Sequence, residues 1–427
     1  MATETNKYFR DLGFQTIKQL ETDQGILASG RSELFGCIFG RDTLITSLKL
    51  LRVYKKTNDS ELKRIVRKAL INLAALQGRE VNIESGEQPG KTIHEFRPDN
   101  HEHLTKYLSK PWYIYNDSAM RNYDTVDATS LFLIAVYRYW QYTKDDEFVA
   151  MLMPNILAAI NWHFEYGDSN NDDFIDYQFS PKRTYGGLVT QNWMDSVESV
   201  FHETDGVLIY PMAPVEVQAY AYLAYRLWAR FFGLGHDPLS IKLNQKAEKI
   251  KQAFNQKFVT QDPDGNIYLA WKLDGEGVSF RSVRSNIGHV LWASMNIADD
   301  GIVDCILDPQ YIRAVVKRLM MRDMFEPKAG IRTLSTYSRN FKPNSYHNGS
   351  IWPHDNSLIA EGFEIHGFSR ESNQVKDAML KAISNFKTPI ELFVYIDGHY
   401  ANYCSAQGQE ACKTQAWSAA AILDFAT

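Results

Sequence analysis

The sequence predicts an all-α protein whose helices form a barrel of two concentric layers. Two observations lead to this prediction. Segments that are apolar on nearly every side alternate along the chain with segments that are apolar on one side only. The first kind is typical of an inner helix that is covered all round, and the second of an outer helix with one face in water. Patterns typical of β-strands are also scarce.

The expected helices follow one another in chain order. Residues 61–76 form a one-sided helix, because six apolar side chains lie at helical spacing opposite Lys and Arg residues: Leu62, Ile65, Val66, Ala69, Leu70 and Leu73. Residues 216–232 are apolar nearly all round, and residues 241–254 return to one stripe of Ile241, Ala247, Ile250 and Phe254. The remaining expected helices are 127–140, 354–363, 371–386 and 414–425, and residues 265–274 form a short hairpin arm.

Composition limits the classes of function. The net charge of -5 lacks the excess of Lys and Arg that contacts with nucleic-acid phosphates require. We find neither a secretion signal nor an apolar run long enough to cross a membrane, which predicts a cytoplasmic protein without a membrane partner. The four cysteines have no CxxC spacing, so no zinc site or disulfide framework is indicated. Aromatic residues, at 13%, suit either a large core or a sugar-binding pocket.

The chain shows no stretch rich enough in Pro, Gly or Ser to serve as a linker, so we expect residues 1–427 to form one domain. Its loops carry carboxylates with Arg, His or Trp nearby, in "FGRDT", "KTIHEFRPD", "YDTVDAT", "QNWMDS", "SYHNGSIWPHDN" and "PIELFVYIDGHY". We expect several of these loops to converge on one pocket. The alternative is that they are separate turns and caps, with Asp42 and Asp127 as N-caps of helices.

These motifs resemble those of the α-1,6-glucosidase portion of glycogen debranching enzymes and of bacterial amylo-α-1,6-glucosidase-like proteins. The resemblance runs from "FGRDTLITSLKLLR" to "CKTQAWSAAAIL" and includes "IHEFR", "WMDS" and "HNGSIWPHDNSLIAEG". A weaker likeness extends to alkaline invertases, trehalases and the glucosylglycerate and mannosylglycerate hydrolases. The resemblance implies an (α/α)6 barrel, a six-hairpin toroid with active-site loops at one end, and an inverting glycoside hydrolase.

An inverting mechanism needs a general acid and a general base roughly 6.5 to 9.5 Å apart on opposite faces of the sugar. Asp195 follows the apolar residues Trp193 and Met194, which would raise its pKa by desolvation. It also occupies the general-acid position of the family's "WMD" motif. Glu391, in "PIELF", matches the family's "PELF" and is the expected base, with Glu410 as its main rival.

The other motif positions are expected to hold the substrate. In "GRD", Arg41 and Asp42 resemble the family's pair that binds hydroxyls of the terminal sugar, and such bidentate groups suit a diol. The further expected substrate-binding residues are His94, Glu95, Arg97, Asp127, Trp193, His347, Asn348, Trp352, His354 and Asp355. For each of these, a purely structural role remains an alternative. The long loop at 78–122 is a possible lid over the pocket.

Residues 168–176, "DSNNDDFID", begin like a calcium-binding loop, with Asp168, Asn170 and Asp172 at the first, third and fifth positions. Asp173 stands where Gly is needed and Phe179 where a bidentate Glu is needed. We therefore interpret the segment as a polar turn, and we expect no metal and no cofactor.

The sequence thus predicts an inverting glycoside hydrolase that releases a terminal hexose, most simply glucose, from an α-glycoside. A polymer-debranching activity is one form of this function. Hydrolysis of a small α-glycoside such as sucrose, trehalose or glucosylglycerate is another, since debranching enzymes usually carry further domains. A sugar epimerase or a non-catalytic carbohydrate-binding protein on the same barrel are the alternatives from other classes. The oligomeric state is left open.

Overall fold

The computed structural model describes residues 2–203, 206–262, 264–296 and 303–427. Within these ranges the chain forms thirteen α-helices, and its strands are only two to four residues long, which confirms the all-α prediction. Contacts within the chain divide it into two compact units. Unit 1 contains residues 1–169, 177–195 and 412–427, and unit 2 contains residues 170–176 and 196–411. The expectation of a single domain stays a prediction.

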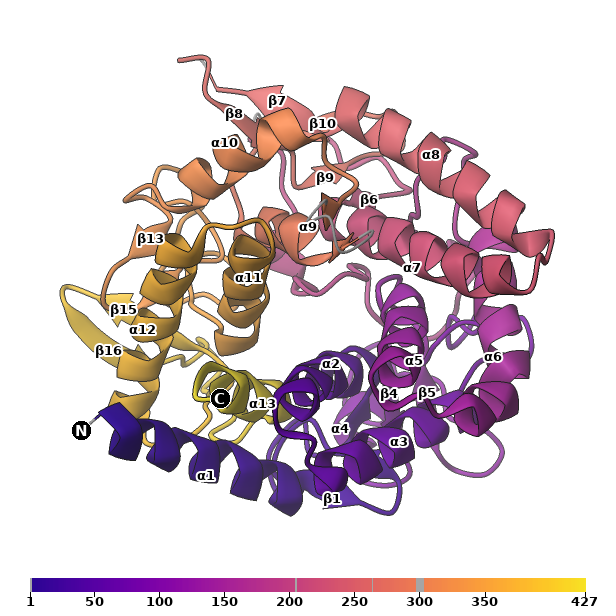
Figure 1. The fold of residues 1–427 in the computed structure, drawn as a ribbon, viewed down its shortest axis with the longest axis horizontal. Helices are drawn as coiled ribbons and strands as arrows, with labels where there is room; N and C mark the ends of the chain where they lie inside the picture. Colours follow the sequence, from indigo (N-terminus) through magenta and orange to yellow (C-terminus); the bar gives the residue numbers. More distant parts are fainter. Residues whose placement is uncertain (1, 204–205, 263, 297–302) are drawn as a thin grey trace. The chain divides into compact units, whose positions relative to one another are not determined.

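Unit 1 contains seven helices of the described chain. They are α1 (Ala2–Leu20), α2 (Gly40–Thr57), α3 (Ser60–Ala75), α4 (Glu102–Thr105), α5 (Ala128–Thr143), α6 (Asp146–Glu165) and α13 (Ala416–Phe425). Figure 1 shows α2 beside both α5 and α13, while α1 packs along α13. The first and last helices of the chain are therefore neighbours within this unit.

Two kinds of helix occur in unit 1, as the hydrophobic pattern predicts. Helix α13 is buried along nearly its whole length, and α5 is buried from Ala128 to Tyr137. Helix α3 instead buries one stripe, which contains all six apolar residues expected from the sequence, and Asp59 caps its first turn by accepting from the Glu61 amide. The stripe could be predicted from the sequence because one-sided burial leaves the other face polar.

The buried carboxylate of Asp424 connects the C-terminal helix α13 to α2 through ion pairs. Asp424, on α13, accepts from Arg52 Nε at 2.9 Å and from Lys56 Nζ at 3.2 Å. The Lys49 ammonium lies 3.7 Å from its second oxygen, and the side chains of Lys49 and Asp424 are 1% and 3% exposed. Charges this well buried are tolerated only when they are paired, so this cluster holds the two helices in register.

Unit 2 contains the other six helices of the described residues. They are α7 (Val215–Leu234), α8 (Leu239–Lys257), α9 (His289–Trp292), α10 (Pro309–Leu319), α11 (Pro353–Ile365) and α12 (Ser369–Phe386). Helix α7 is buried on nearly all sides and packs on α8, and α11 packs on α12 and α9. In α8 the stripe differs from the prediction: Leu243 is buried, whereas Ile241 is 64% exposed.

The strands form small antiparallel ladders. In unit 1 these are β1 (Glu21–Thr22), β2 (Gly25–Ile26), β3 (Ile38–Phe39), β4 (Glu95–Arg97) and β5 (Met120–Asn122). In unit 2 they are β6 (Ala213–Pro214), β7 (Val259–Gln261), β8 (Ile267–Leu269), β9 (Lys272–Leu273), β10 (Ser279–Phe280), β11 (Met295–Asn296), β12 (Val303–Asp304), β13 (Phe325–Glu326), β14 (Gly330–Ile331), β15 (Phe393–Ile396) and β16 (His399–Asn402).

The predicted hairpin at 265–274 is wrong in its pairing. Strand β8 pairs with β7, whereas β9 pairs with β10 and β6, so the two strands of this segment belong to different sheets. The sequence shows strand character at these residues, but the partners come from elsewhere in the chain.

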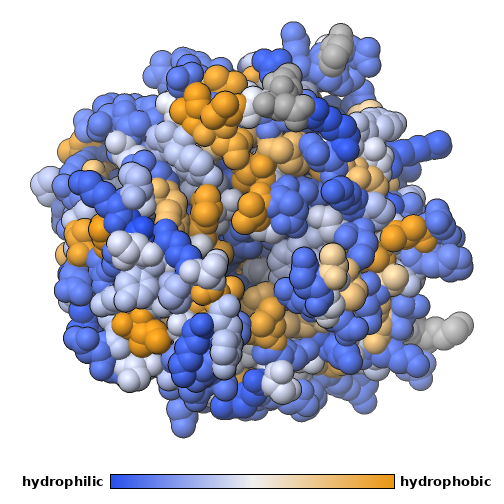
Figure 2. All heavy atoms as spheres, turned by 180° about the vertical axis from the view of Figure 1, so that it is seen from behind, coloured by the Kyte–Doolittle hydropathy of each residue, from blue (hydrophilic) through white to orange (hydrophobic). Residues whose placement is uncertain are grey.

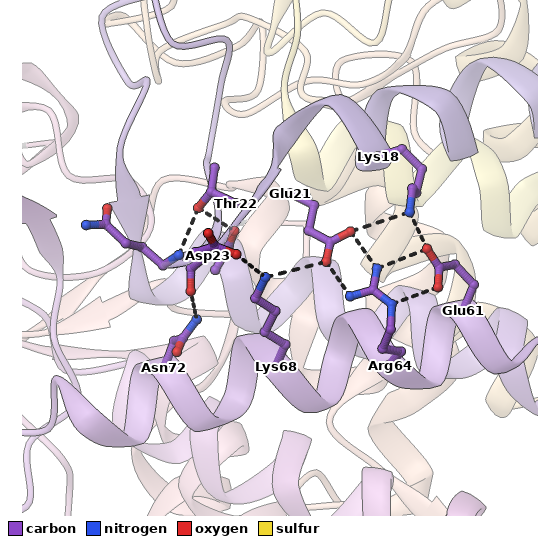
Figure 3. A network of polar contacts seen from close by, with 10 residues as sticks. Lys18, Glu21, Thr22, Asp23, Glu61, Arg64, Lys68 and Asn72 are labelled. Carbon is purple, nitrogen blue, oxygen red and sulfur yellow. Dashed lines mark hydrogen bonds and ion pairs between the residues drawn. The ribbon is translucent and has the colours of Figure 1, made fainter.

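An exposed ion-pair network joins α1 to α3 through the β1–β2 hairpin (Figure 3). Arg64 on α3 donates to both oxygens of Glu21, at 2.6 and 2.7 Å, and also to Glu61. Lys18 contacts Glu61, and Lys68 reaches Asp23 at 3.0 Å. Because these side chains are in contact with water, we expect each pair to contribute little to stability.

Figure 2 shows one face, on which hydrophobic residues lie in separate groups within a mainly hydrophilic surface. Within the described ranges, no helix combines the length and the hydrophobicity that a membrane crossing requires.

We predict that Asp424→Asn lowers the free energy of unfolding by about 3 kcal/mol, because it leaves Lys49 buried without its countercharge. Glu61→Gln, in the exposed network of Figure 3, is the matched control and should cost much less. Urea denaturation followed by circular dichroism measures both. Equal losses from the two variants would contradict the assignment of the Asp424 cluster as the stronger link.

Candidate active site

In unit 1, the "FGRD" motif forms the tight junction between β3 and α2. The Gly40 amide donates to the His94 carbonyl at 2.9 Å. A Cβ atom at Gly40 would lie 1.9 Å from the Ile93 carbonyl oxygen, so only glycine permits this close approach. The junction places Arg41 and Asp42 in the first turn of α2, beside the strand that carries Glu95.

Arg41 is shared by two carboxylates. One terminal nitrogen, Nη1, donates to Asp127 Oδ2 at 2.8 Å, and the other, Nη2, donates to Asp195 Oδ2 at 2.9 Å. Asp127 also accepts from the Thr125 hydroxyl at 2.6 Å through its second oxygen. The guanidinium is 5% exposed and Asp127 fully buried, whereas a quarter of the Asp195 side chain is exposed. Of the two carboxylates, Asp195 is therefore the one with access to solvent.

This arrangement favours the protonated form of Asp195. Burial is the main cause that raises the pKa of Asp195 to about 6; Arg41 opposes the shift, while Asp127 and Glu95 add to it. The direction is the one predicted from the neighbours Trp193 and Met194, which are 3% and 0% exposed. For Arg41, burial acts to lower the pKa, but the carboxylates around it raise the pKa above its ordinary value. A carboxyl of this kind can hold a proton near neutral pH.

Neither Asp42 nor Asp127 caps a helix through its side chain. Helix α2 begins at Gly40, before Asp42, and the Asp42 carboxylate instead accepts from Gln415 Nε2 at 2.9 Å. Asp127 stands at the N-cap position of α5, but its oxygens are bound to Thr125 and Arg41. The capping alternative is thus wrong for both. The Gln415 contact also joins the "GRD" and "TQAWS" motifs, which are 373 residues apart.

The "HEFR" motif lies on β4 and is buried. Glu95 pairs with Arg97 and accepts from Cys37 Sγ at 3.7 Å, while Arg97 Nη2 donates to the Leu34 carbonyl at 2.7 Å. Burial raises the pKa of Glu95, and burial with Arg41 nearby lowers the pKa of His94 well below its usual range. His94 is therefore neutral at pH 7. Residues 78–122 thus contribute Glu95 to the surroundings of Asp195, although a lid function for them stays a prediction.

In unit 2, Glu391 precedes β15 and is 2% exposed. The Tyr346 hydroxyl donates to Glu391 Oε1. Tyr346 in turn packs edge-on against Trp352 and lies against Tyr403, with ring centroids 4.9 and 5.3 Å apart. The rival carboxylate, Glu410, is exposed and lies in a loop that pairs with Cys404.

A buried arginine that the sequence did not single out organises the segment after Asp195. Arg284 donates to the carbonyls of Ser199 and His347 at 2.6 and 2.8 Å, and to Asn348 Oδ1 at 2.8 Å. Asn348 Nδ2 donates to the Glu198 carbonyl at 2.8 Å, and His347 Nδ1 lies 2.8 Å from the Ser196 hydroxyl. Burial lowers the pKa of Arg284 to about 9. Arg284 lies in a polar stretch of the sequence, which gave no indication that its side chain would be buried.

The remaining predicted residues of unit 2 form a second buried cluster at the start of α11. The His347 ring stacks on Trp352, with centroids 5.2 Å apart, and Trp352 meets His354 edge-on. Asp355 Oδ1 lies 2.8 Å from His289 Nε2, and His289 Nδ1 lies 2.7 Å from the Tyr220 hydroxyl. Sequence reasoning missed His289 and Tyr220, because each lies in a segment that reads as apolar core.

The structure therefore brings the predicted residues together in two groups. The group in unit 1 contains Arg41, Asp42, His94, Glu95, Arg97, Asp127, Trp193 and Asp195. The group in unit 2 contains Glu391, His347, Asn348, Trp352, His354 and Asp355. Their roles in substrate binding stay predictions. In the described part of the chain, no three His, Cys, Asp or Glu side chains are grouped so as to hold a metal ion.

Comparison with known proteins gives consistent results. Residues 111–424 match the family model described as amylo-alpha-1,6-glucosidase. A GH63 mannosylglycerate hydrolase from Thermus thermophilus has a similar structure, with a TM-score of 0.66 at 13% identity, over 98% of this chain and 100% of that chain. An uncharacterised conserved protein from the same organism gives 0.65 at 13% identity over the same shares of the two chains.

A glycosidase variant solved in complex with glucose gives a TM-score of 0.60 at 14% identity, over 100% of this chain and 96% of that chain. No curated protein sequence matches this chain. The structural matches confirm the predicted (α/α)6-barrel fold class, which GH63 enzymes have.

We predict that Asp195→Asn changes how stability depends on pH. Because the pKa of Asp195 is raised from 3.8 to about 6 in the folded protein, its contribution to stability is full below pH 3.8 and is lost as the pH rises through about 6. Between about pH 4 and pH 7 the variant should therefore gain about 2 kcal/mol relative to wild type. The exposed quarter of the side chain keeps the effect from being larger.

Urea denaturation at three pH values across this range measures the difference. Asp117→Asn is a suitable control, since Asp117 is exposed, bonded to Arg121, and has a lowered pKa, so its stabilising contribution should instead be lost at low pH. A difference between Asp195→Asn and wild type that does not vary with pH would contradict the raised pKa.

Proposed function

We propose that this chain, which belongs to the amylo-alpha-1,6-glucosidase family, hydrolyses a terminal α-linked hexose with inversion of configuration, using Asp195 as general acid and Glu391 as general base. The chain is a glycoside hydrolase by its family. The observation that carries the proposed mechanism is the carboxyl of Asp195, which retains solvent access, is held by Arg41, and has its pKa raised to about 6.

The acid role follows from these properties. A general acid must carry a proton at working pH and release it to the leaving group in the transition state. Desolvation supplies the first property, and the Arg41 guanidinium supplies the second, because it stabilises the carboxylate that remains after transfer. Asp127 is not suited to this role, since both of its oxygens are already bonded and its side chain is fully buried.

The base role is supported for Glu391 over Glu410 by their surroundings. A general base works best when it is oriented, and the Tyr346 hydroxyl holds one oxygen of Glu391 in place. Glu410 is exposed to solvent, which would leave its carboxylate hydrated and mobile.

In the proposed reaction, Asp195 gives its proton to the glycosidic oxygen as the bond from that oxygen to C1 of the sugar breaks. A water molecule attacks C1 from the opposite face, and Glu391 takes a proton from it. The products are a β-hexose and the free alcohol. The proton on Glu391 then passes to solvent, and Asp195 takes a proton from solvent before the next turnover.

Two classes of leaving group fit this chemistry. The family points to a sugar joined by an α-1,6 bond. The similarity to a mannosylglycerate hydrolase, which covers nearly all of both chains, favours a small glycoside with an organic acid as a second candidate. We therefore propose isomaltose, panose and glucosylglycerate as first substrates, with maltose, trehalose and sucrose completing the panel.

We predict that Asp195→Asn and Glu391→Gln each lower kcat/KM on the best substrate of this panel about 100-fold or more. On α-glucosyl fluoride, whose leaving group needs little protonation, Asp195→Asn should keep much more of its activity than Glu391→Gln. Glu364→Gln, which removes an exposed carboxylate on α11 bonded to Lys376, is the matched control and should resemble wild type. Equal losses on the fluoride from the two active-site variants would contradict the assigned division of roles.

We also predict that the β anomer is the first hexose released from an α-glycoside. Proton NMR recorded within the first minutes, before mutarotation, distinguishes the two anomers. First release of the α anomer would show a retaining mechanism and overturn the proposal, whereas absence of any free hexose across the panel would overturn hydrolysis of these substrates.

A further inference from the structure

We propose that Arg41 and Asp127 are positioning residues: Arg41 orients Asp195 through one carboxylate oxygen, and Asp127 holds Arg41 and weakens its pull on the Asp195 proton. This inference rests on the proposed role of Asp195 as general acid. For these two residues, it is an alternative to the expectation from the sequence that they bind the substrate.

Both terminal nitrogens of Arg41 are hydrogen-bonded to carboxylates. Its two terminal nitrogens are bonded to Asp127 at 2.8 Å and to Asp195 at 2.9 Å, and its side chain is 5% exposed. The segments that it joins are 86 and 154 residues apart in the chain. Each terminal nitrogen of Arg41 thus already donates one hydrogen bond to a carboxylate.

Both oxygens of the Asp127 carboxylate are hydrogen-bonded as well. One oxygen accepts from Arg41, the other accepts from Thr125 at 2.6 Å, and the side chain is fully buried. Asp195 differs, because Arg41 engages Oδ2 only, and Oδ1 accepts no side-chain hydrogen bond within the described part of unit 1. The Oδ1 oxygen of Asp195, which Arg41 does not engage, is therefore the one that can carry the proton toward a leaving group.

The charges explain why one cation is shared between two carboxylates. With Arg41 charged and both carboxylates ionised, the group carries one net negative charge, and one proton makes it neutral. A buried site favours the neutral state. If Arg41 faced Asp195 alone, the ionised pair would already be neutral, and the proton would be held less firmly. Asp127 thus offsets part of the positive charge of Arg41 and keeps Asp195 able to bind a proton.

The other titratable groups near Arg41 and Asp195 raise the pKa of Asp195, as Asp127 does, are bonded to partners of their own, or are neutral. Glu95 raises the pKa of Asp195 but is itself paired with Arg97. Asp42, beside Arg41, is bonded to Gln415, and His94 is neutral because its pKa is lowered. The two strongest charged influences on Asp195 are thus Arg41 and Asp127, and they have opposite signs.

The opposite signs give a test that a merely structural ion pair would not pass. Arg41→Gln should raise the pKa of Asp195, and Asp127→Asn should lower it, each by about one pH unit or more. In kcat/KM profiles, the limb at high pH reports loss of the general-acid proton in the free enzyme. The high-pH limb should therefore shift to higher pH in Arg41→Gln and to lower pH in Asp127→Asn. In Arg41→Lys, which keeps the charge, the limb should stay closer to its position in wild type.

The control is Arg183→Gln. Arg183 forms a similarly buried pair with Asp124 in the same unit, at 2.7 Å, so its loss should lower stability without moving the limb at high pH. The pKa of Asp195 is measured independently of activity by NMR titration of the full chain carrying ¹³C-carboxyl aspartate. The Asp195 signal is assigned by its absence in Asp195→Asn. This readout remains available if a variant is inactive, and the lower pKa of Asp195 expected in Asp127→Asn tests the inference if Arg41→Gln does not fold.

The outcomes separate the two proposals. Opposite shifts of the NMR pKa in Arg41→Gln and Asp127→Asn support the inference even if Asp195→Asn hydrolyses normally, in which case the general-acid role is what fails. No shift, or shifts of one sign in both variants, overturns the inference even if hydrolysis depends on Asp195. Equal movement of the high-pH limb in the Arg183→Gln control would also overturn it, because the effect would then be general.

Discussion

Unit 1 depends on one guanidinium that is buried and shared by two carboxylates. Placing Arg41 in the interior is costly, and the cost is offset only because Asp127 and Asp195 both reach it at hydrogen-bond distance. The same contacts fix three segments: the start of α2, the entrance to α5 and the end of the segment at 177–195. The glycine before Arg41 is part of this constraint, since only a residue without a Cβ lets the chain pass Ile93 at that point.

Unit 2 holds its proposed catalytic carboxylate in a different way. Glu391 accepts a hydrogen bond from a neutral donor, the Tyr346 hydroxyl. Its buried arginine, Arg284, is bonded mainly to backbone carbonyls and to an amide, and lies over the Trp271 ring at 4.5 Å. Arg41 is therefore bonded to the proposed acid, while Arg284 is bonded to backbone carbonyls and to the Asn348 amide.

Similarity in fold does not identify the leaving group of the substrate, and the reason is physical. At 13% identity, the mannosylglycerate hydrolase shares the arrangement of helices with this chain, but the side chains that would meet an aglycone are not specified by that arrangement. Protonation of a glycosidic oxygen and activation of water are the same steps for a branched glucan and for a glycosylated acid. The role proposed for Asp195 is therefore the same for either substrate.

The sequence by itself determined the helical class, the one-sided stripe of α3, the apolar character of α7 and α13, and the motifs that carry the candidate residues. These are local properties, readable because burial on one side or on all sides leaves a pattern within a few turns. It also indicated the direction of the pKa shift of Asp195 from its apolar neighbours.

Only the tertiary structure decided what each polar group is bonded to. Asp42 and Asp127 look like helix caps in sequence, yet their partners are Gln415, Arg41 and Thr125. The strands at 267–269 and 272–273 likewise pair with segments other than each other. Arg284 and His289 gave no local signal, and Tyr346 lies in the "SYHNGSIWPHDN" loop without having been singled out. Partners as distant as Gln415 from Asp42 or Arg41 from Asp127 leave no periodicity in the chain, because their pairing depends on burial and distance that exist only after folding.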